Sequence, residues 1–292
     1  MKSPIELYLS KEITSKNKIP FSEFMDIALF HKEYGYYTNK SQIFGSEGDF
    51  ITSPITSSLF GESISNEFIN LNSVAQPMSI LELGGGDASL AISLIKNLAK
   101  IKSLPEKYII LEISNNLIEV QKRKIKEEIP ELYELFSWVD NLENQKIKGL
   151  IIANEFFDAL PSERFRMRNG KVENLYIKNH NNNFEYTWFP ATELLKKELS
   201  TAKNNHSILI PENYTSDINL QYRRWIANLE NCLESGAIFI IDYGYNAKEY
   251  FLEERNEGTL VCIYNHKANF DFFSHIGQQD ISTFVNFSHL TN

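Results

Sequence analysis

The sequence contains few cysteines, and they lie far apart. Only Cys232 and Cys262 occur in 292 residues, and neither belongs to a Cys-x-x-Cys pair or to a cysteine and histidine spacing typical of metal ligands. A disulfide framework is therefore not expected, and we predict no metal site. Both cysteines fall in or beside apolar stretches, so we expect reduced, buried thiols.

The chain also lacks an excess of positive charge and a long apolar run. Its 29 Lys and Arg against 38 Asp and Glu give a net charge of −9, which argues against a nucleic-acid-binding surface. No stretch approaches the roughly 18 apolar residues that a membrane span needs. The start, "MKSPIELYLSKEITSKNK", has neither the apolar core of a signal peptide nor the acid-poor composition of a transit peptide. We therefore expect a cytoplasmic protein without a membrane span.

From Met78 onward, short apolar runs alternate with helical patterns. The expected strands are "MSILEL", "YIILEI", "ELFSWV", "GLIIANE" and "GAIFIIDYG". The expected helices are "ASLAISLIKNLAKI", "SNNLIEVQKRKIKEEI" and "NLQYRRWIANLENCLES". This alternation predicts right-handed crossovers and an α/β fold with a doubly wound, mostly parallel, Rossmann-like sheet.

Two further segments complete the predicted organisation. Residues 1–77 are expected to form N-terminal helices, "SPIELYLSKEI" and "PFSEFMDIALFHKEYGYY", followed by a loop that contains glycine. Residues 78–292 would form the sheet domain. Within it, an insertion at about 162–210 holds "NGKVENLYI" and "NNNFEYTWF", which predict two β-hairpins in a small antiparallel subdomain.

The end of the first expected strand has the composition of a ligand site. It reads "LELGGGDASLA", so that Glu82 precedes the run Gly84, Gly85 and Gly86 at the start of a helix. In an open parallel sheet, ligands bind at the carboxyl ends of strands, where glycines permit positive φ and close approach to the backbone. A dinucleotide fingerprint would require glycine at Ser89, and no lysine follows to make a phosphate loop. The acidic residue before the glycines favours a cationic ligand.

The second expected strand ends at Glu112, where such folds place a carboxylate that accepts hydrogen bonds from ribose hydroxyls. A ribose, a positive charge and no phosphate together indicate S-adenosylmethionine. Two structural alternatives remain open. The glycines could form a tight turn only, and Glu112 could merely stabilise a neighbouring helix N-terminus.

The order of the motifs resembles that of a known family. The segments "FGSEGDFITSP", "LELGGGDASL", "NEFFDALP", "IDYGY" and "GQQDISTFVNFSHL" look like successive motifs of the MidA family of class I methyltransferases. This is the family of the mitochondrial complex I assembly factor that methylates an arginine of a complex I subunit. The resemblance covers about residues 19–292. It implies an S-adenosylmethionine-dependent methyltransferase fold and a protein partner, by resemblance a respiratory complex I subunit.

The resemblance also implies roles for single positions. Glu82, Gly84, Gly85 and Gly86 would form the cofactor loop, and Glu112 would be the ribose acid. The segment with Gly48, Asp49, Phe50 and Thr52 would close over the methionine end of the cofactor.

Two features depart from the family pattern. Gly85 replaces a proline and Ala88 replaces a glycine. Family members also continue past "VNFSHL" with a helix and two strands. Without these strands, we expect the strand that holds Phe239 and Ile241 to have one unpaired edge.

The resemblance further implies that the segment "NEFFDALP" lines the acceptor side, with Asn154, Glu155, Phe156 and Asp158. Methyl transfer from a sulfonium is a direct displacement, so the nucleophile must be held in line, about 3 to 3.5 Å from the methyl group. A carboxylate pair that binds two guanidinium nitrogens would orient the third. We predict Glu155 for this role and Asp158 as the second carboxylate, with Asn154 lining the acceptor side. The two phenylalanines of the segment could wall the channel.

Structural alternatives apply to this segment too. Asp158 could cap a turn, and Phe157 could belong to the core. Asp242 and Tyr243, which end the next strand, could reach the site or make structural hydrogen bonds. His266 could be a general base or a solvated loop histidine.

Three functions follow from these observations. The first is a methyltransferase acting on an arginine of a protein, and the second is methylation of a small molecule or of another side chain. The third is a non-catalytic assembly protein that binds S-adenosylmethionine. Ser89 argues against a nicotinamide oxidoreductase. The sequence predicts no oligomeric state.

Overall fold

The computed structural model describes residues 2–39, 58–72 and 78–291. Its contacts divide the chain into two compact units. Unit 1 comprises Met1–Tyr36, Phe157–Arg224 and Asp242–Asn292, and unit 2 comprises Tyr37–Phe156 and Trp225–Ile241. These units follow contacts rather than chain order, and the domain boundary expected after residue 77 stays a prediction.

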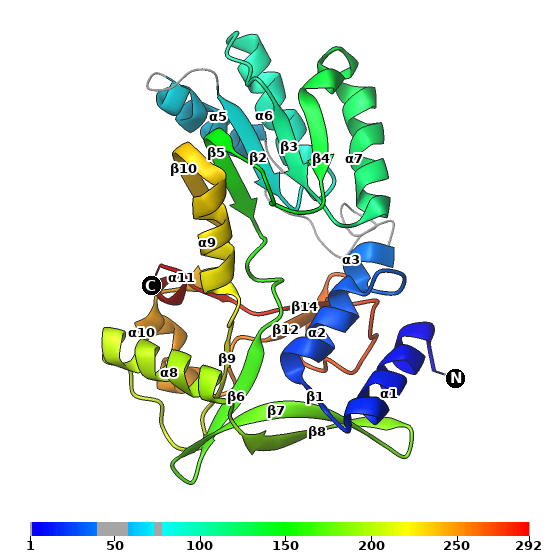
Figure 1. Ribbon diagram of the computed structural model, residues 1–292, viewed down its shortest axis with the longest axis vertical. Coiled ribbons are helices and arrows are strands. Elements are labelled where there is room, and N and C mark those ends of the chain that lie inside the picture. The colour runs from blue at the N-terminus through cyan, green and yellow to red at the C-terminus, as the bar shows by residue number, and fades with distance from the viewer. Residues whose placement is uncertain (1, 40–57, 73–77, 292) are drawn as a thin grey trace. The chain divides into compact units, whose positions relative to one another are not determined.

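Unit 2 contains the expected parallel sheet (Figure 1). Its strands are β2 (Ser79–Leu83), β3 (Tyr108–Leu111), β4 (Phe136–Val139), β5 (Ile147–Asn154) and β10 (Leu233–Ile241). All neighbours are parallel, in the order β10-β5-β2-β3-β4. The strands after β2 continue to one side as β3 and β4, whereas β5 and β10 lie on the other. The order therefore reverses between β2 and β5, the place where open α/β sheets bind ligands.

Helices α5 (Ser58–Asn72), α6 (Ser89–Lys100) and α7 (Asn115–Glu128) pack on this sheet, and α9 spans Tyr222–Cys232. A short 3-10 helix, η1 (Pro130–Leu135), leads into β4. Leucines spaced along α6 pack with apolar side chains from one face of β2, β3 and β5 in a single core cluster. Successive side chains along each strand point to this face and to the opposite face in turn, as the pleat of a strand requires. The helices predicted after β2 and β3 are thus confirmed.

Two glycines allow close approach between central strands. Gly149 on β5 has φ +137°, and a Cβ there would lie 2.1 Å from the Ser79 carbonyl oxygen. Gly236 on β10 has φ +125°, and a Cβ there would lie 1.8 Å from the Gly149 oxygen. Within the described part of the chain, β10 pairs with β5 alone, so the unpaired edge expected for this strand is observed there.

Unit 1 contains a five-stranded antiparallel sheet. Its strands are β1 (Ile19–Pro20), β6 (Glu163–Arg168), β7 (Lys171–His180), β8 (Asn183–Pro190) and β9 (Thr215–Ile218). The antiparallel pairing of β6, β7 and β8 confirms the predicted hairpins. Two features were not predicted. The sheet recruits β1 and β9 from outside the insertion, and a helix, α8 (Glu193–His206), lies inside it.

The N-terminal helices also occur in unit 1, with one difference. Helix α1 (Pro4–Lys16) begins at a capping box made by Ser3 and Glu6. Helix α2 (Phe21–Phe30) was expected to end at Gly35 but ends earlier, and α3 (Tyr36–Asn39) follows. It ends because His31 leaves the helical conformation and its carbonyl accepts from the backbone N–H groups that follow, which closes a turn.

The rest of unit 1 consists of short elements. They are β11 (Gly244–Tyr245), α10 (Ala247–Tyr250), η2 (Glu253–Arg255), β12 (Val261–Tyr264), β13 (Lys267–Asn269), β14 (Asp280–Ser282), β15 (Val285–Asn286) and α11 (Phe287–Leu290). Among the helices of the described residues, none is both long and apolar enough to cross a membrane.

Candidate cofactor and acceptor site

The loop after β2 needs its glycines for two different physical reasons. Gly84 and Gly86 have φ +66° and +52°, in the left-handed region of the backbone that residues other than glycine rarely adopt. Gly85 instead lies tightly against the sheet, since a Cβ there would be 2.8 Å from Cγ2 of Ile110. At Gly84, an added Cβ would first meet Phe156, at 3.3 Å. The backbone therefore demands two of the glycines, and packing demands the third.

This packing gives a physical reason for glycine at residue 85. Ile110 occupies the space beside it, so a side chain there would have to displace Ile110. Ala88 adopts φ +67° at the start of α6, a conformation that glycine would adopt at lower cost.

Glu112 follows β3 and is nearly buried, with 7% of its surface exposed. Its Oε1 accepts from the backbone N–H of Ser114 at 2.9 Å, and its Oε2 accepts from Nε2 of Gln121 at 3.3 Å. The backbone N–H of Ile113 also donates to this carboxylate. A carboxylate can accept about four hydrogen bonds, so these three leave acceptor capacity for a ligand hydroxyl. Burial raises the pKa of Glu112 to about 7, against the effect of these hydrogen bonds.

Glu82, near the end of β2, is also buried. The Tyr108 hydroxyl donates to its Oε2 at 2.8 Å. Burial raises the pKa of Glu82 to about 7; the Tyr108 hydrogen bond opposes this shift, and the charges of Asp87 and Glu112 add to it. Two carboxyl groups with raised pKa values at neighbouring strand ends are typical of a functional site. A cationic ligand would favour their ionised forms.

Helix α7 ties these elements together through side chains that the sequence interpretation missed. Gln121 donates from Nε2 to the carbonyl oxygen of Gly86 at 3.0 Å, as well as to Glu112. Lys124 pairs with Asp87 of the loop at 2.6 Å and donates to Oγ of Ser89 at 2.7 Å. The structure thus brings the predicted glycine loop and the predicted ribose acid together.

Asn154 and Glu155 stand at the end of β5, beside the switch point in strand order. Asn154 is the last residue of β5 and pairs with Ile241 of β10. Glu155 has φ +48°, and its backbone N–H donates to the Ile241 oxygen at 2.8 Å. A left-handed conformation at a residue other than glycine, Asn or Asp stores strain, and such strain is frequent at functional sites.

Phe156 places this segment next to the glycine loop within unit 2. Its ring packs edge to face on Trp225, with 4.9 Å between ring centroids, and it is the nearest neighbour of a Cβ placed on Gly84. The acceptor segment and the cofactor loop that the sequence predicted are therefore adjacent here.

Phe157 and Asp158 belong to unit 1, and their surroundings there favour structural interpretations for some candidates. Phe157 is fully buried and packs edge to face on Tyr222, as a core residue does. Oδ2 of Asp242 accepts from the backbone N–H groups of Phe157 and Asp158, at 2.9 and 3.3 Å, and Oδ1 accepts from that of Tyr243 at 2.8 Å. Asp242 therefore organises the turn after "NEFF". The catalytic role of Asp158 stays a prediction.

His266 occupies the two-residue turn between β12 and β13. It and Asn265 both have positive φ, and its side chain is exposed to solvent. This is the geometry of a tight hairpin turn, which supports the interpretation of His266 as a solvated loop residue.

The comparisons with known proteins bear directly on this site. Residues 59–292 match the family described as "Putative S-adenosyl-L-methionine-dependent methyltransferase". The chain belongs to this family. A crystal structure of a Burkholderia thailandensis protein bound to S-adenosyl-homocysteine is 27% identical, with a TM-score of 0.90 over 99% of this chain and 77% of that chain. A native structure from the same organism is 25% identical, with a TM-score of 0.87 over 100% of this chain and 76% of that one.

Curated relatives carry a more specific name. The Drosophila melanogaster "Protein arginine methyltransferase NDUFAF7 homolog, mitochondrial" is 31% identical over 191 residues, which is 58% of this chain and 43% of the relative. The mouse "Protein arginine methyltransferase NDUFAF7, mitochondrial" is 24% identical over 319 residues, 99% of this chain and 69% of the relative. The match therefore covers less than half of the Drosophila relative.

Family membership confirms the predicted methyltransferase family, its α/β fold and S-adenosylmethionine as cofactor. The residues of unit 2 fit this cofactor. Gly84 of the glycine loop is exposed, Glu112 keeps acceptor capacity for a ligand hydroxyl, and the acidic strand ends suit a positively charged sulfur. The assignment of each residue stays a prediction.

Two predictions remain, one about the residues that cover the cofactor and one about metal ions. The predicted covering residues Gly48, Asp49, Phe50 and Thr52 lie outside the described residues. Among the residues that the structure does describe, no group of three His, Cys, Asp or Glu side chains could hold a metal ion.

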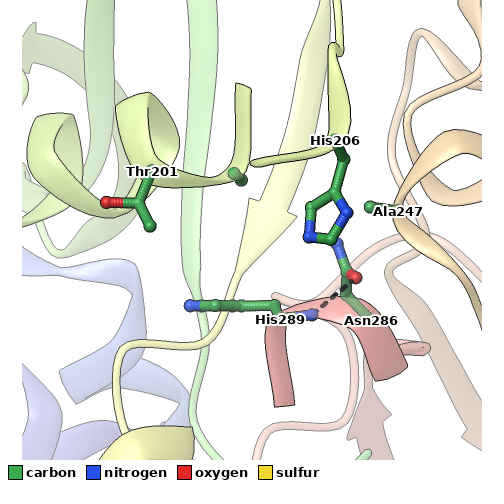
Figure 2. A pocket seen from close by; sticks show the side chains of 6 residues that line it. Thr201, His206, Ala247, Asn286 and His289 are labelled. Atoms are coloured by element: carbon green, nitrogen blue, oxygen red, sulfur yellow. Dashed lines mark hydrogen bonds between the residues drawn. The ribbon is translucent and has the colours of Figure 1, made fainter. Parts of the chain in front are cut away.

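A small pocket in unit 1 is unrelated to the cofactor. Figure 2 shows its side chains, with His206 pointing toward Asn286. It is lined by Thr201, Ala202, His206, Ala247, Asn286 and His289. Its volume of about 10 Å³ has room for roughly one water molecule, so a nucleoside could not enter it.

Proposed function

We propose that this chain is an S-adenosylmethionine-dependent methyltransferase whose acceptor is an arginine side chain of a protein. The observation that carries the proposal is the arrangement at the β2 and β5 strand ends. There, a glycine loop with an exposed Gly84 is joined through Gln121 to the buried acid Glu112, and it lies beside Phe156, which follows the strained Glu155. The names of the curated relatives support arginine as the acceptor.

S-adenosylmethionine, when bound, supplies a methyl group on a positively charged sulfur. Glu112, which keeps acceptor capacity beside its present hydrogen bonds, would accept from the ribose hydroxyls. The backbone of Gly84 and Gly86 would allow close approach of the ligand, and the N-terminus of α6 would favour its carboxylate. Glu82 would add negative charge at the strand end.

Glu155 would orient the acceptor. A guanidinium is charged and planar, and a carboxylate can bind two of its N–H groups in parallel. This interaction would fix the plane of the group and leave one nitrogen facing the methyl donor. The same carboxylate can hold the proton that the methylated nitrogen loses. Asn154 would line the acceptor side, with the ring of Phe156 against the guanidinium plane.

The partner is a protein substrate in this proposal. By the resemblance of the sequence motifs, a respiratory complex I subunit is the first partner to test.

The test combines binding and turnover. We expect the wild-type chain to transfer isotope-labelled methyl groups to arginine in a purified complex I subunit, detected by mass spectrometry. Glu155→Gln keeps the shape of the side chain but removes its charge, and should retain S-adenosyl-homocysteine binding while losing on the order of 100-fold or more in turnover. A substrate with the modified arginine changed to lysine is the control. Full turnover by Glu155→Gln would show that the assigned role is wrong.

Binding without any methyl transfer would have a different meaning. If the wild-type chain binds the cofactor but modifies no candidate protein, the non-catalytic assembly function replaces the enzymatic one.

A further inference from the structure

A buried glutamine in α7 uses its whole side-chain amide to join parts of the cofactor site. Gln121 has 0% of its surface exposed. Its Nε2 donates to the carbonyl oxygen of Gly86 at 3.0 Å and to Oε2 of Glu112 at 3.3 Å, while its Oε1 accepts from the indole Nε1 of Trp138 at 2.7 Å. One amide thus connects the glycine loop, the predicted ribose acid and β4.

These partners permit one orientation of the amide. The Gly86 carbonyl oxygen and the ionised Glu112 carboxylate can only accept, and the indole of Trp138 can only donate. Turning the amide over would place its oxygen against two acceptors and its NH₂ group against the indole N–H. An amide whose partners are all matched in a buried site is held firmly, because every alternative leaves buried polar groups unpaired.

We propose that Gln121 is a positioning residue for the cofactor, oriented by Trp138, that fixes the distance between the Gly86 backbone and the Glu112 carboxylate. The inference rests on the proposed function, since it takes Gly86 and Glu112 as cofactor contacts. Gln121 acts through these two groups. In the ligand-free protein it would preset the geometry that the ribose and the methionine end of the ligand must meet.

A competing explanation is that Gln121 only satisfies buried polar groups and stabilises the fold. Gln279 in unit 1 offers a matched control for this explanation. It is also 0% exposed, its Nε2 donates to the Asp271 oxygen at 2.9 Å, and its Oε1 accepts from Nδ2 of Asn269 at 3.1 Å. Its substitution removes a comparable buried amide from the other unit.

The experiment is titration calorimetry with S-adenosyl-homocysteine on the wild type, Gln121→Leu and Gln279→Leu, with the melting temperature of each. Hydrogen bonds to charged groups suggest a loss of about 10- to 100-fold in affinity for Gln121→Leu. Gln279→Leu should bind within about twofold of the wild type, because its amide touches no part of the site. Equal affinity of folded Gln121→Leu and wild type would overturn the inference.

A second variant keeps the test decisive if Gln121→Leu does not fold. In Gln121→Glu, an ionised carboxylate would repel Glu112, whereas a protonated one could donate where the amide did. The ratio of wild-type to variant affinity should therefore shrink several-fold from about pH 8 to about pH 6. A ratio that stays constant over this range would overturn the inference.

The two proposals can fail separately. If the wild type itself does not bind S-adenosyl-homocysteine, the proposed function is wrong and this inference falls with it. If the wild type binds and Gln121 variants bind equally well, only the positioning role is wrong.

Discussion

At the scale of single residues, burial controls the chemistry of the cofactor site. Burial raises the pKa values of Glu112 and Glu82 to about 7 in the ligand-free chain. A substantial fraction of each carboxyl group is therefore protonated near neutral pH. Ribose hydroxyls donate stronger hydrogen bonds to an ionised carboxylate than to a protonated one. A positively charged sulfur also attracts the ionised form. Ligand binding and ionisation are therefore linked.

This linkage predicts a pH dependence with a definite sign. Affinity for S-adenosylmethionine should rise as the pH rises through about 7 and level off above it, with loss of affinity at lower pH. Binding near neutral pH should release protons, which calorimetry in buffers of different ionisation enthalpy detects. A constant affinity from about pH 6 to about pH 8 would contradict the assignment of Glu112.

The same groups affect the stability of the ligand-free chain. Their pKa values in the folded state, about 7, exceed the ordinary value of 4.5. Their contribution to stability is therefore present at low pH and is lost as the pH rises from about 4.5 to about 7.

Two substitutions of Glu155 separate the cost of its backbone conformation from the catalytic role of its carboxylate. Its φ of +48° is tolerated better by glycine than by alanine. Both Glu155→Gly and Glu155→Ala remove the carboxylate and should abolish methyl transfer. Glu155→Gly should nevertheless be more stable than Glu155→Ala by about 1 kcal/mol in urea unfolding. Equal stability of the two variants would mean that the left-handed conformation carries no cost here.

Some residues of the candidate site could be singled out from the sequence, and others could not. Glu82, Gly84, Gly86 and Glu112 could be, because they directly follow or end apolar strands, and their roles stay predictions. Gln121 was missed because a polar residue in a helix is ordinarily solvated. A signal existed, since the residues that α7 buries, Leu117, Gln121 and Ile125, share one helical stripe.

At the scale of elements, the contact between β5 and β10 depends on glycine. Gly236→Ala would place a Cβ 1.8 Å from the Gly149 oxygen, at a φ that alanine rarely adopts. We expect a loss of about 3 kcal/mol or more in the free energy of unfolding, or failure to fold. Gly170→Ala is the control: φ is +68°, and nothing lies within 4 Å of the added Cβ. It should cost only about 1 kcal/mol. Similar losses in both variants would show that strand contact does not decide the effect.

The elements of the parallel sheet were predictable because buried parallel strands are continuous apolar runs. β1 and β9 were not, since they are short and gain their stability from pairing with strands distant in sequence, as Ile19 does with Ile177. Helix α8 was missed although its signal was present. Thr192 caps it, and Leu195, Leu199 and Ala202 are buried along it.

At the scale of the whole molecule, the predicted cofactor contacts in the described residues all belong to unit 2. Ligand binding should therefore protect the backbone amides of the β2 to α6 and β3 to α7 segments most strongly in hydrogen exchange. The antiparallel sheet of unit 1 serves as the internal control. Protection that appears mainly in residues 162–210 would move the binding site to the other unit.

Titration calorimetry of the purified chain with S-adenosylmethionine, S-adenosyl-homocysteine and NAD decides whether the glycine loop is a cofactor site. We expect micromolar binding of the first two and no binding of NAD, because the loop lacks the third glycine of a dinucleotide site. A folded chain that binds neither of the first two, or that binds NAD instead, would contradict this expectation.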